Sequence, residues 1–204
     1  MKPHWNFFER IVCINLPHRT DRRDSSEIEF KRVGVDVGYF EAIPHLDGRI
    51  GLIRSLYAIF EQNYDTRNIL IFEDDVKFIN DPVNKLLLAL RDLPQNYELF
   101  YFGANRTQPC QLLTSNIKIL KGALAAHAVC YSKSVYDRYM AHLKRVSDQG
   151  FINDSKEIND VYLTSIQENG LSFMVHPMIA TQRPGYSDLE KTNVDYSWMQ
   201  HQNN

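Results

Sequence analysis

The sequence has little cysteine. It contains Cys13, Cys110 and Cys130, and no C-x-x-C pair. An odd number of cysteines without paired spacing argues against a disulfide framework and against a structural zinc site. Cys13 and Cys130 lie within apolar runs, where a free cysteine behaves as a small hydrophobic residue. We therefore expect a protein of a reducing compartment, the cytoplasm.

Other features are absent as well. No apolar run approaches the length of a membrane-spanning helix. The first 16 residues carry charge inside their apolar part and have no small-residue cleavage site, so we expect no signal peptide. A net charge of -2 argues against a general nucleic-acid binder. We also find no internal repeat, linker or low-complexity segment, and we predict neither a transmembrane segment nor a nucleic-acid partner.

The composition is that of a folded domain. The 204 residues are 44% hydrophobic and include 11 Tyr and 11 Phe, which suits one domain with a sizeable core. Strand-like runs at 10–16, 37–43, 68–73, 97–103, 125–132 and 171–177 alternate with helical patterns at 20–33, 51–63 and 133–145. This alternation predicts an α/β fold with a mostly parallel central sheet and helices on both faces.

Two further helices are indicated by their ends. Asp81 and Pro82 have the types favoured at an N-cap and at the first helical position. Asp154 and Glu157 have capping-box spacing, and Gly170 can end the helix that follows. We place a single domain at residues 1–183. Residues 184–204 form a polar and loosely packed tail that could close as a loop over a bound ligand.

The stretch "NILIFEDDVKF" (68–78) places three adjacent carboxylates at the end of an apolar strand. In a parallel sheet, ligands bind beyond the carboxyl ends of the strands. Extended backbone would put Glu73 and Asp75 on one face and Asp74 on the other. Plain solvent exposure would explain the triplet, but a divalent cation would also offset the mutual repulsion, because hard cations take oxygen ligands. The triplet therefore favours metal-assisted chemistry on a phosphorylated substrate.

Several short motifs occur in an order that resembles glycosyltransferase family 25, the group with lipopolysaccharide-biosynthesis and procollagen galactosyltransferases. They are "CINLPHRTDRR", "GLIRSLYAIFEQ", "ILIFEDDV", "YFGAN", "AAHAVCYSKSVYDRYM", "INDVYL" and "HPMIATQRPGYSDLE", spread over about residues 10–190. The resemblance implies a single-domain A-type glycosyltransferase fold, Rossmann-like, that binds a nucleotide-sugar. It also implies an Asp-x-Asp-type motif that holds Mn²⁺ or Mg²⁺ on the diphosphate.

The resemblance assigns roles to the acidic triplet. Asp75 would be the direct metal ligand, Glu73 would face the ribose or a metal-bound water, and Asp74 would support both. A histidine after the late strands often completes the metal site in such enzymes, and His176 is the candidate. An ordinary surface imidazole is the alternative, and His127, inside a strand, is expected to be structural.

The resemblance also names the groups around the donor and acceptor. Asn15, Arg19 and Arg22 follow the first strand and would meet the nucleotide, with Arg23 as a further candidate or a surface residue. Arg183, near Gln182, Tyr186 and Ser187, would lie in a loop that closes over the diphosphate. The glycines of "GAN" and "GALAAH" could let the sugar approach the backbone.

Asp160 is the candidate general base for the acceptor hydroxyl, with Asp154 and Glu157 as weaker substitutes. The apolar pattern of its helix would otherwise leave Asp160 on an exposed polar side.

The expected reaction moves a hexose such as galactose from a UDP-sugar to a hydroxyl of a glycan, a lipid-linked sugar or a protein, with inversion. One departure favours an alternative, a catalytically degenerate binding module on the same fold. The family has Ser-His in the helix before the acidic strand, and this chain has Ser55–Leu56. A nucleotidyltransferase is a third possibility, but the glycine-rich, Lys- or Arg-bearing loop suited to that chemistry does not follow the first strand.

Overall fold

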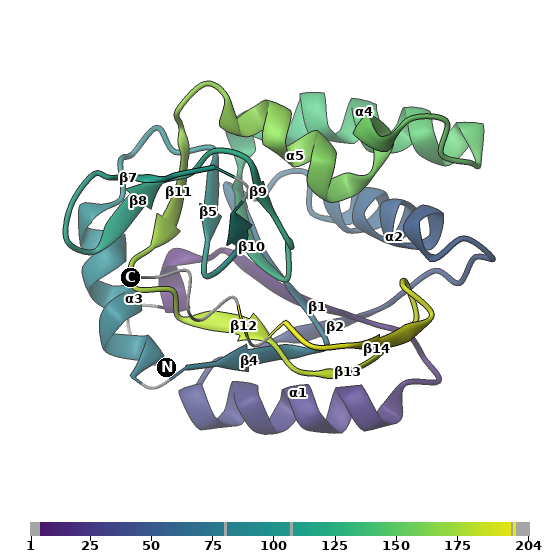
Figure 1. Ribbon diagram of the computed structural model, residues 1–204, viewed down its shortest axis with the longest axis horizontal. Coiled ribbons are helices and arrows are strands. Elements are labelled where there is room, and N and C mark those ends of the chain that lie inside the picture. The colour runs from purple at the N-terminus through teal and green to yellow at the C-terminus, as the bar shows by residue number, and fades with distance from the viewer. Residues whose placement is uncertain (1–4, 80, 107, 197, 199–204) are drawn as a thin grey trace.

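A computed structural model describes residues 5–79, 81–106, 108–196 and 198 (Figure 1). Its centre is one eight-stranded sheet of order β2-β1-β3-β10-β5-β11-β8-β7. The strands are β1 (Arg10–Asn15), β2 (Gly38–Glu41), β3 (Asn68–Glu73), β5 (Leu99–Tyr101), β7 (Gln111–Leu112), β8 (Ile117–Ile119), β10 (Ala128–Ser132) and β11 (Ser172–Val175). β10 is antiparallel to β3 and β5, and β8 is antiparallel to β11 and β7. β10 and β8 thus run against the other six strands, which confirms the mostly parallel α/β sheet.

Helices cover both faces of this sheet, as predicted (Figure 1). They are α1 (Thr20–Val33), α2 (Gly48–Gln62), α3 (Pro82–Asp92), α4 (Tyr136–Gln149) and α5 (Asn159–Gln167), with short 3-10 turns at Trp5–Phe7, Lys133–Val135 and Ser155–Glu157. None of the helices in the described part of the chain is long and apolar enough to cross a bilayer.

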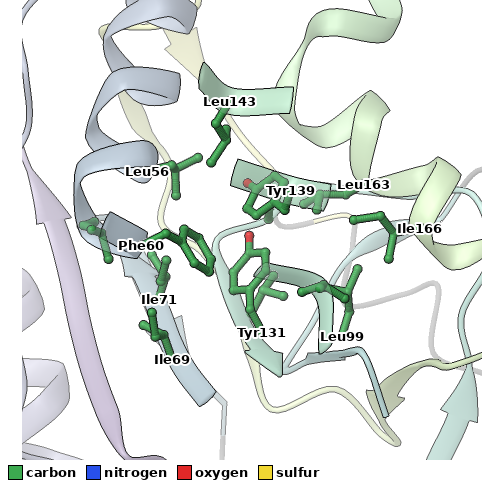
Figure 2. Packing of buried hydrophobic residues seen from close by; sticks show 14 of the residues in the cluster. Leu56, Phe60, Ile69, Ile71, Leu99, Tyr131, Tyr139, Leu143, Leu163 and Ile166 are labelled. Atoms are coloured by element: carbon green, nitrogen blue, oxygen red, sulfur yellow. The ribbon is translucent and has the colours of Figure 1, made fainter. Parts of the chain in front are cut away.

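The central strands are buried on both faces, which explains their continuous apolar runs. On β3, Ile69 and Ile71 join the core beneath α2, α4 and α5, whereas Leu70 and Phe72 join the core beneath α1 and α3. Figure 2 shows the first of these cores, where Phe60 of α2 packs against Tyr131 of the sheet and Tyr139 of α4. Side chains of α5 belong to the same core.

Helix ends follow the expected chemistry with one correction. Gly34 ends α1 with φ 71°, and Pro82 begins α3. Asp81 does precede α3, but its carboxylate accepts from Asn84 Nδ2 (2.8 Å) and its backbone has φ 53°. Asp154 and Glu157 do form a capping box, although it caps the 3-10 turn Ser155–Glu157, and α5 begins only afterwards, at Asn159.

The acidic strand does not continue through the triplet. β3 ends at Glu73, Asp74 and Asp75 form a turn, and the chain resumes as β4 (Val76–Phe78). β4 pairs antiparallel with β12 (Ala180–Gln182), a pairing that the sequence did not predict, and Arg183 N donates to Asp75 O (2.7 Å). The expected alternation of Glu73, Asp74 and Asp75 between faces is therefore wrong, because a turn replaces extended backbone there.

The end of the chain also differs from the expected loose tail. β13 (Gly185–Ser187) and β14 (Thr192–Val194) form an antiparallel hairpin, and Figure 1 shows it between the ends of α1 and α2. Another small pairing joins β6 (Asn105–Arg106) to β9 (Ala123–Leu124). The last part of the predicted tail, 199–204, lies outside the described residues.

Gly103 marks a close approach between two backbones. A Cβ built on Gly103 would lie 2.0 Å from the carbonyl oxygen of Ala180 in β12. The glycine of "GAN" therefore admits a neighbouring strand of the same chain, rather than a sugar as expected.

We predict that Gly103→Ala lowers the free energy of unfolding by about 3 kcal/mol or more, because two backbones must separate to admit the methyl group. Urea denaturation measures this change. Gly185→Ala is the matched control, because a Cβ there meets nothing within 4 Å. Equal stability of the two variants would contradict the prediction.

Candidate active site

A cavity of about 1090 Å³ lies at the carboxyl ends of β1 and β3. Glu73, Asp74 and Asp75 line it on one side, and Asp160 of α5 lines it on another. Apolar side chains from the ends of β1 and β2 and from the following loop, Ile14, Leu16, Ala42 and Ile43, also face it. The hairpin β13–β14 contributes Ser187, Asp188 and Leu189. The structure thus places the acidic triplet at the sheet edge where ligands of such folds bind.

Asp74 is held by two side chains from the first strand and the first helix. Its Oδ2 accepts from Asn15 Nδ2 (2.8 Å), and its Oδ1 pairs with Arg22 Nη1 (2.7 Å). Asp74 is only 6% exposed, and the contact with Arg22 that compensates its charge is therefore largely shielded from solvent. Asn15 and Arg22, which we expected to meet the nucleotide, fix the position of the acidic turn. Among the described residues, Arg22 lines the cavity and Asn15 does not.

Glu73 and Asp75 have much weaker compensation. Gln182 Nε2 lies 3.3 Å from Glu73 Oε2 and 3.5 Å from Asp75 Oδ2, and Arg22 Nη1 lies 3.7 Å from Asp75 Oδ2. Asp75 Oδ1 is buried and has no hydrogen-bond partner in the described part of the chain. Burial raises the pKa of Asp75 to about 6, and burial together with the neighbouring Asp75, Asp160 and Asp74 carboxylates raises the pKa of Glu73 well above its usual range.

These two carboxylates fit a divalent cation. Magnesium and manganese often use one or two protein carboxylates and complete their shell with phosphate oxygens and water. The buried Asp75 oxygen without a partner offers a ligand atom, and a cation would offset both the burial and the carboxylate repulsion that raise the two pKa values. Over the described residues, however, no group of three or more His, Cys, Asp and Glu side chains is arranged to hold a metal ion.

His176 stands apart from this cavity. It follows β11, and its backbone N donates to Asn116 O (2.8 Å), near β8. Among the described residues it is not part of the cavity lining. The structure therefore brings together two of the three predicted metal ligands.

Asp160 faces the cavity rather than solvent. Its Oδ2 accepts from the backbone N of Ala125 (2.8 Å), a residue with φ 65°. A left-handed backbone is unfavourable for alanine and is retained where surrounding contacts enforce it. Burial raises the pKa of Asp160 above its usual value. The expectation from the apolar helical pattern, an exposed residue, is thus corrected, because the start of α5 packs beside β9 and Ala125.

The other candidate carboxylates are used structurally. Glu157 pairs with Arg145 (2.7 Å) and accepts from Asn153 N (2.7 Å), while Asp154 accepts from Lys156 N (2.9 Å). Both line a separate, shallower groove between α4 and the start of α5. This placement removes them as substitutes for Asp160.

Arg19 and Arg183 lie close to the site, but their guanidinium groups are bound by other groups of the protein. Arg19 pairs with Asp21 and Asp188, and Arg183 Nη2 donates to Ser25 O (3.2 Å) in α1. Among the described residues neither lines the cavity, whereas Arg22 does. Arg23 lies instead over the ring of Tyr39, 4.3 Å from its centroid.

Two residues shape the site in ways that sequence reasoning did not anticipate. Gln182 was expected in a loop that closes over the diphosphate, but it belongs to β12, and its side chain reaches both Glu73 and Asp75. Ala125 supplies the N–H that orients Asp160. The sequence signal for Gln182 was its place in "HPMIATQRPGYSDLE", which did not indicate a contact with the acidic triplet.

Leu56 and His127 are core residues. Leu56 is 3% exposed and packs with Phe60 and Leu143 (Figure 2), so position 56 of this chain points into the core and not into the cavity. His127 is fully buried, its Nδ1 lies 3.1 Å from Ala125 O, and burial lowers its pKa to about 4. The structural role expected for His127 fits this placement.

Comparisons with known proteins support the fold. No family model matches the chain, and no curated protein matches its sequence. The chain is similar in structure to a glycosyltransferase involved in the glycosylation of the major capsid of PBCV-1, with a TM-score of 0.51, 15% identity, and coverage of 75% of this chain and 73% of that one. The chain therefore has a glycosyltransferase-like fold.

Two further structures are more distant. A197 from STIV has a TM-score of 0.49 and 12% identity, and covers 91% of this chain and 93% of its own. Mannose-1-phosphate geranyltransferase from Thermus thermophilus has a TM-score of 0.40 and 8% identity, and covers 80% of this chain and 58% of its own. Both scores are too low to add to the assignment of the fold.

The raised carboxylate pKa values predict how stability depends on pH. The folded chain holds protons on Asp75 and Glu73 that the unfolded chain has released, so the free energy of unfolding falls as pH rises from about 4 to beyond 6. Asp75→Asn removes part of this penalty. In EDTA we expect it to raise stability at pH 8 by on the order of 1–3 kcal/mol and to flatten the pH profile.

Urea denaturation at pH 5 and pH 8 measures this effect. Asp148→Asn is the control, because Asp148 is an exposed carboxylate that pairs with Lys144 on the same helix. The same pH slope in wild type and Asp75→Asn would contradict the prediction.

Proposed function

We propose that this protein is a metal-dependent glycosyltransferase that moves a hexose from a UDP-sugar to an acceptor hydroxyl. The observation that carries the proposal is the pair Glu73–Asp75 at the carboxyl end of β3. Asp75 is buried and Glu73 half-buried, their charges are incompletely compensated, and both face a large cavity. The glycosyltransferase-like fold supports it. The choice of UDP, of a hexose such as galactose, of inversion and of family 25 rests on the sequence motifs.

The residues divide into a donor side and an acceptor side. Asp75 and Glu73 would hold Mn²⁺ or Mg²⁺, which when bound offsets the negative charge that develops on the departing diphosphate. Arg22 and Asn15 fix Asp74 and thereby the turn that carries Asp75. Apolar residues such as Ile14 and Ala42 would cover the nucleoside and exclude water.

Asp160 would accept the proton of the acceptor hydroxyl. The Ala125 N–H binds one of its oxygens, and the carboxylate lies on the wall of the cavity that also holds the triplet. Its raised pKa makes it a stronger base than an exposed aspartate, as a general base at neutral pH requires. The attacking oxygen would bond to the anomeric carbon as the bond to the diphosphate breaks.

We expect the protein to release UDP from a UDP-hexose when Mn²⁺ is present, and to stop when EDTA removes the metal. Asp75→Ala should lower this release by about 100-fold or more, because the developing charge on the diphosphate loses its counterion. A coupled assay for UDP measures the rate, and Asp148→Ala serves as the surface control. Equal rates for wild type and Asp75→Ala would exclude Asp75 as a metal ligand.

Asp160→Asn should separate chemistry from binding. We expect turnover to fall by about 10²–10⁴-fold, because the general base is lost, while UDP with Mn²⁺ still raises the melting temperature. Binding without turnover in the wild-type protein across a panel of UDP-sugars and acceptors would favour the degenerate binding module. If the wild-type protein shows neither binding nor turnover, the proposed function is overturned.

A further inference from the structure

The hairpin β13–β14 closes the candidate active site by joining α1 to α2. At α2, a Cβ built on Gly48 would lie 3.2 Å from Leu189 Cδ1, so the hairpin rests directly on the first turn of that helix. At α1, the hairpin contacts Arg19 and Arg22. Figure 1 shows the hairpin between these two helices.

The contacts with α1 engage the groups that a phosphorylated ligand would need. Asp188 forms an ion pair with Arg19 Nη1, and its Oδ1 lies 3.7 Å from His18 Nε2. The carbonyl oxygen of Tyr186 accepts from Arg19 Nη1 (3.3 Å) and from Arg22 Nη2 (2.8 Å). The Arg19 side chain is only 15% exposed as a result.

A carboxylate and a phosphate oxyanion compete for the same donors. Guanidinium groups bind either one through charge-assisted hydrogen bonds, and a single N–H cannot serve both fully. His18 and Arg22 already face the cavity, and Arg19 would join them if Asp188 withdrew.

We propose that Asp188 is an internal competitor of the donor substrate. Its carboxylate holds the position on Arg19 and His18 that an oxyanion of the donor diphosphate takes, and donor binding displaces it. The inference rests on the proposed function, because that function supplies the diphosphate. It adds a regulatory contact within the same site, between segments 169 residues apart.

The apparent affinity for the donor then depends on how often the hairpin contact is open. A ligand that binds only the open state has its affinity reduced by the fraction of molecules in that state. A substitution at Asp188 that weakens its contact with Arg19 should therefore tighten binding of the donor, even though Asp188 itself faces the cavity.

The test is the affinity for UDP with Mn²⁺, and for inorganic pyrophosphate with Mn²⁺, measured by calorimetry at fixed ionic strength. We expect Asp188→Asn to bind both about tenfold more tightly than wild type, since the closed state loses its ion pair. Glu190→Gln is the matched control, because Glu190 lines the same cavity from the same hairpin and makes the same change in charge.

Asp21→Asn gives a second and opposite control. Asp21 also pairs with Arg19, through Nη2 at 2.8 Å, but it belongs to α1. Without the Asp21 carboxylate, Arg19 still pairs with Asp188. We therefore expect Asp21→Asn to bind UDP no more tightly than wild type does. Trypsin cleavage after Lys191, an exposed residue between β13 and β14, should be faster in Asp188→Asn and not faster in Asp21→Asn.

The outcomes distinguish the two proposals. Binding of UDP by wild type, with Asp188→Asn no tighter than Glu190→Gln, would overturn the role of Asp188 and leave the proposed function intact. Unchanged trypsin cleavage in Asp188→Asn would overturn it as well. If neither wild type nor any variant binds UDP, the proposed function is overturned, and the role of Asp188 is overturned with it.

Discussion

The geometry of the site depends on the contacts that the guanidinium of Arg22 makes. Its Nη1 lies 2.7 Å from Asp74 Oδ1 and 3.7 Å from Asp75 Oδ2, and its Nη2 donates to Tyr186 O (2.8 Å). One side chain thus ties the first helix, the acidic turn and the closing hairpin together. Removing one partner of a buried pair leaves a charge without compensation, which is costly. The turn after β3 would lose its position before the sheet lost its fold.

The larger elements could be predicted from the sequence because their burial pattern is local. Each central strand is apolar on both sides, α1 ends before Gly34, and α3 begins at Pro82. The short strands β4 and β12 could not be predicted. They exist through pairing with each other across the chain, as between Val76 and Gln182, and three residues carry too little periodicity to be recognised.

The site was predictable in its charged centre and less so in its surroundings. The triplet stood out because three carboxylates ended an apolar strand. Asp160 was named through the resemblance, whereas the apolar pattern of its helix predicted an exposed residue, and it lines the same cavity. The partners of these residues could not be predicted. Gln182 reaches Glu73 across 109 positions, and no local pattern specifies such a contact. His176 was placed by resemblance alone, and the fold carries it to the far side of β11, near β8.

The distribution of charge narrows the kind of ligand that the cavity suits. The carboxylates of Glu73, Asp74, Asp75 and Asp160 face it, and Arg22 compensates chiefly Asp74. Close to them, the guanidinium of Arg19 is held by acceptors of the hairpin. An anion alone would be repelled by the carboxylates, and a metal ion alone would leave the arginines bound to the hairpin. Under the proposed function, a metal ion bound to a diphosphate would bring both charges at once. The metal would meet the weakly compensated carboxylates, and the diphosphate would meet the arginines now held by acceptors of the protein itself.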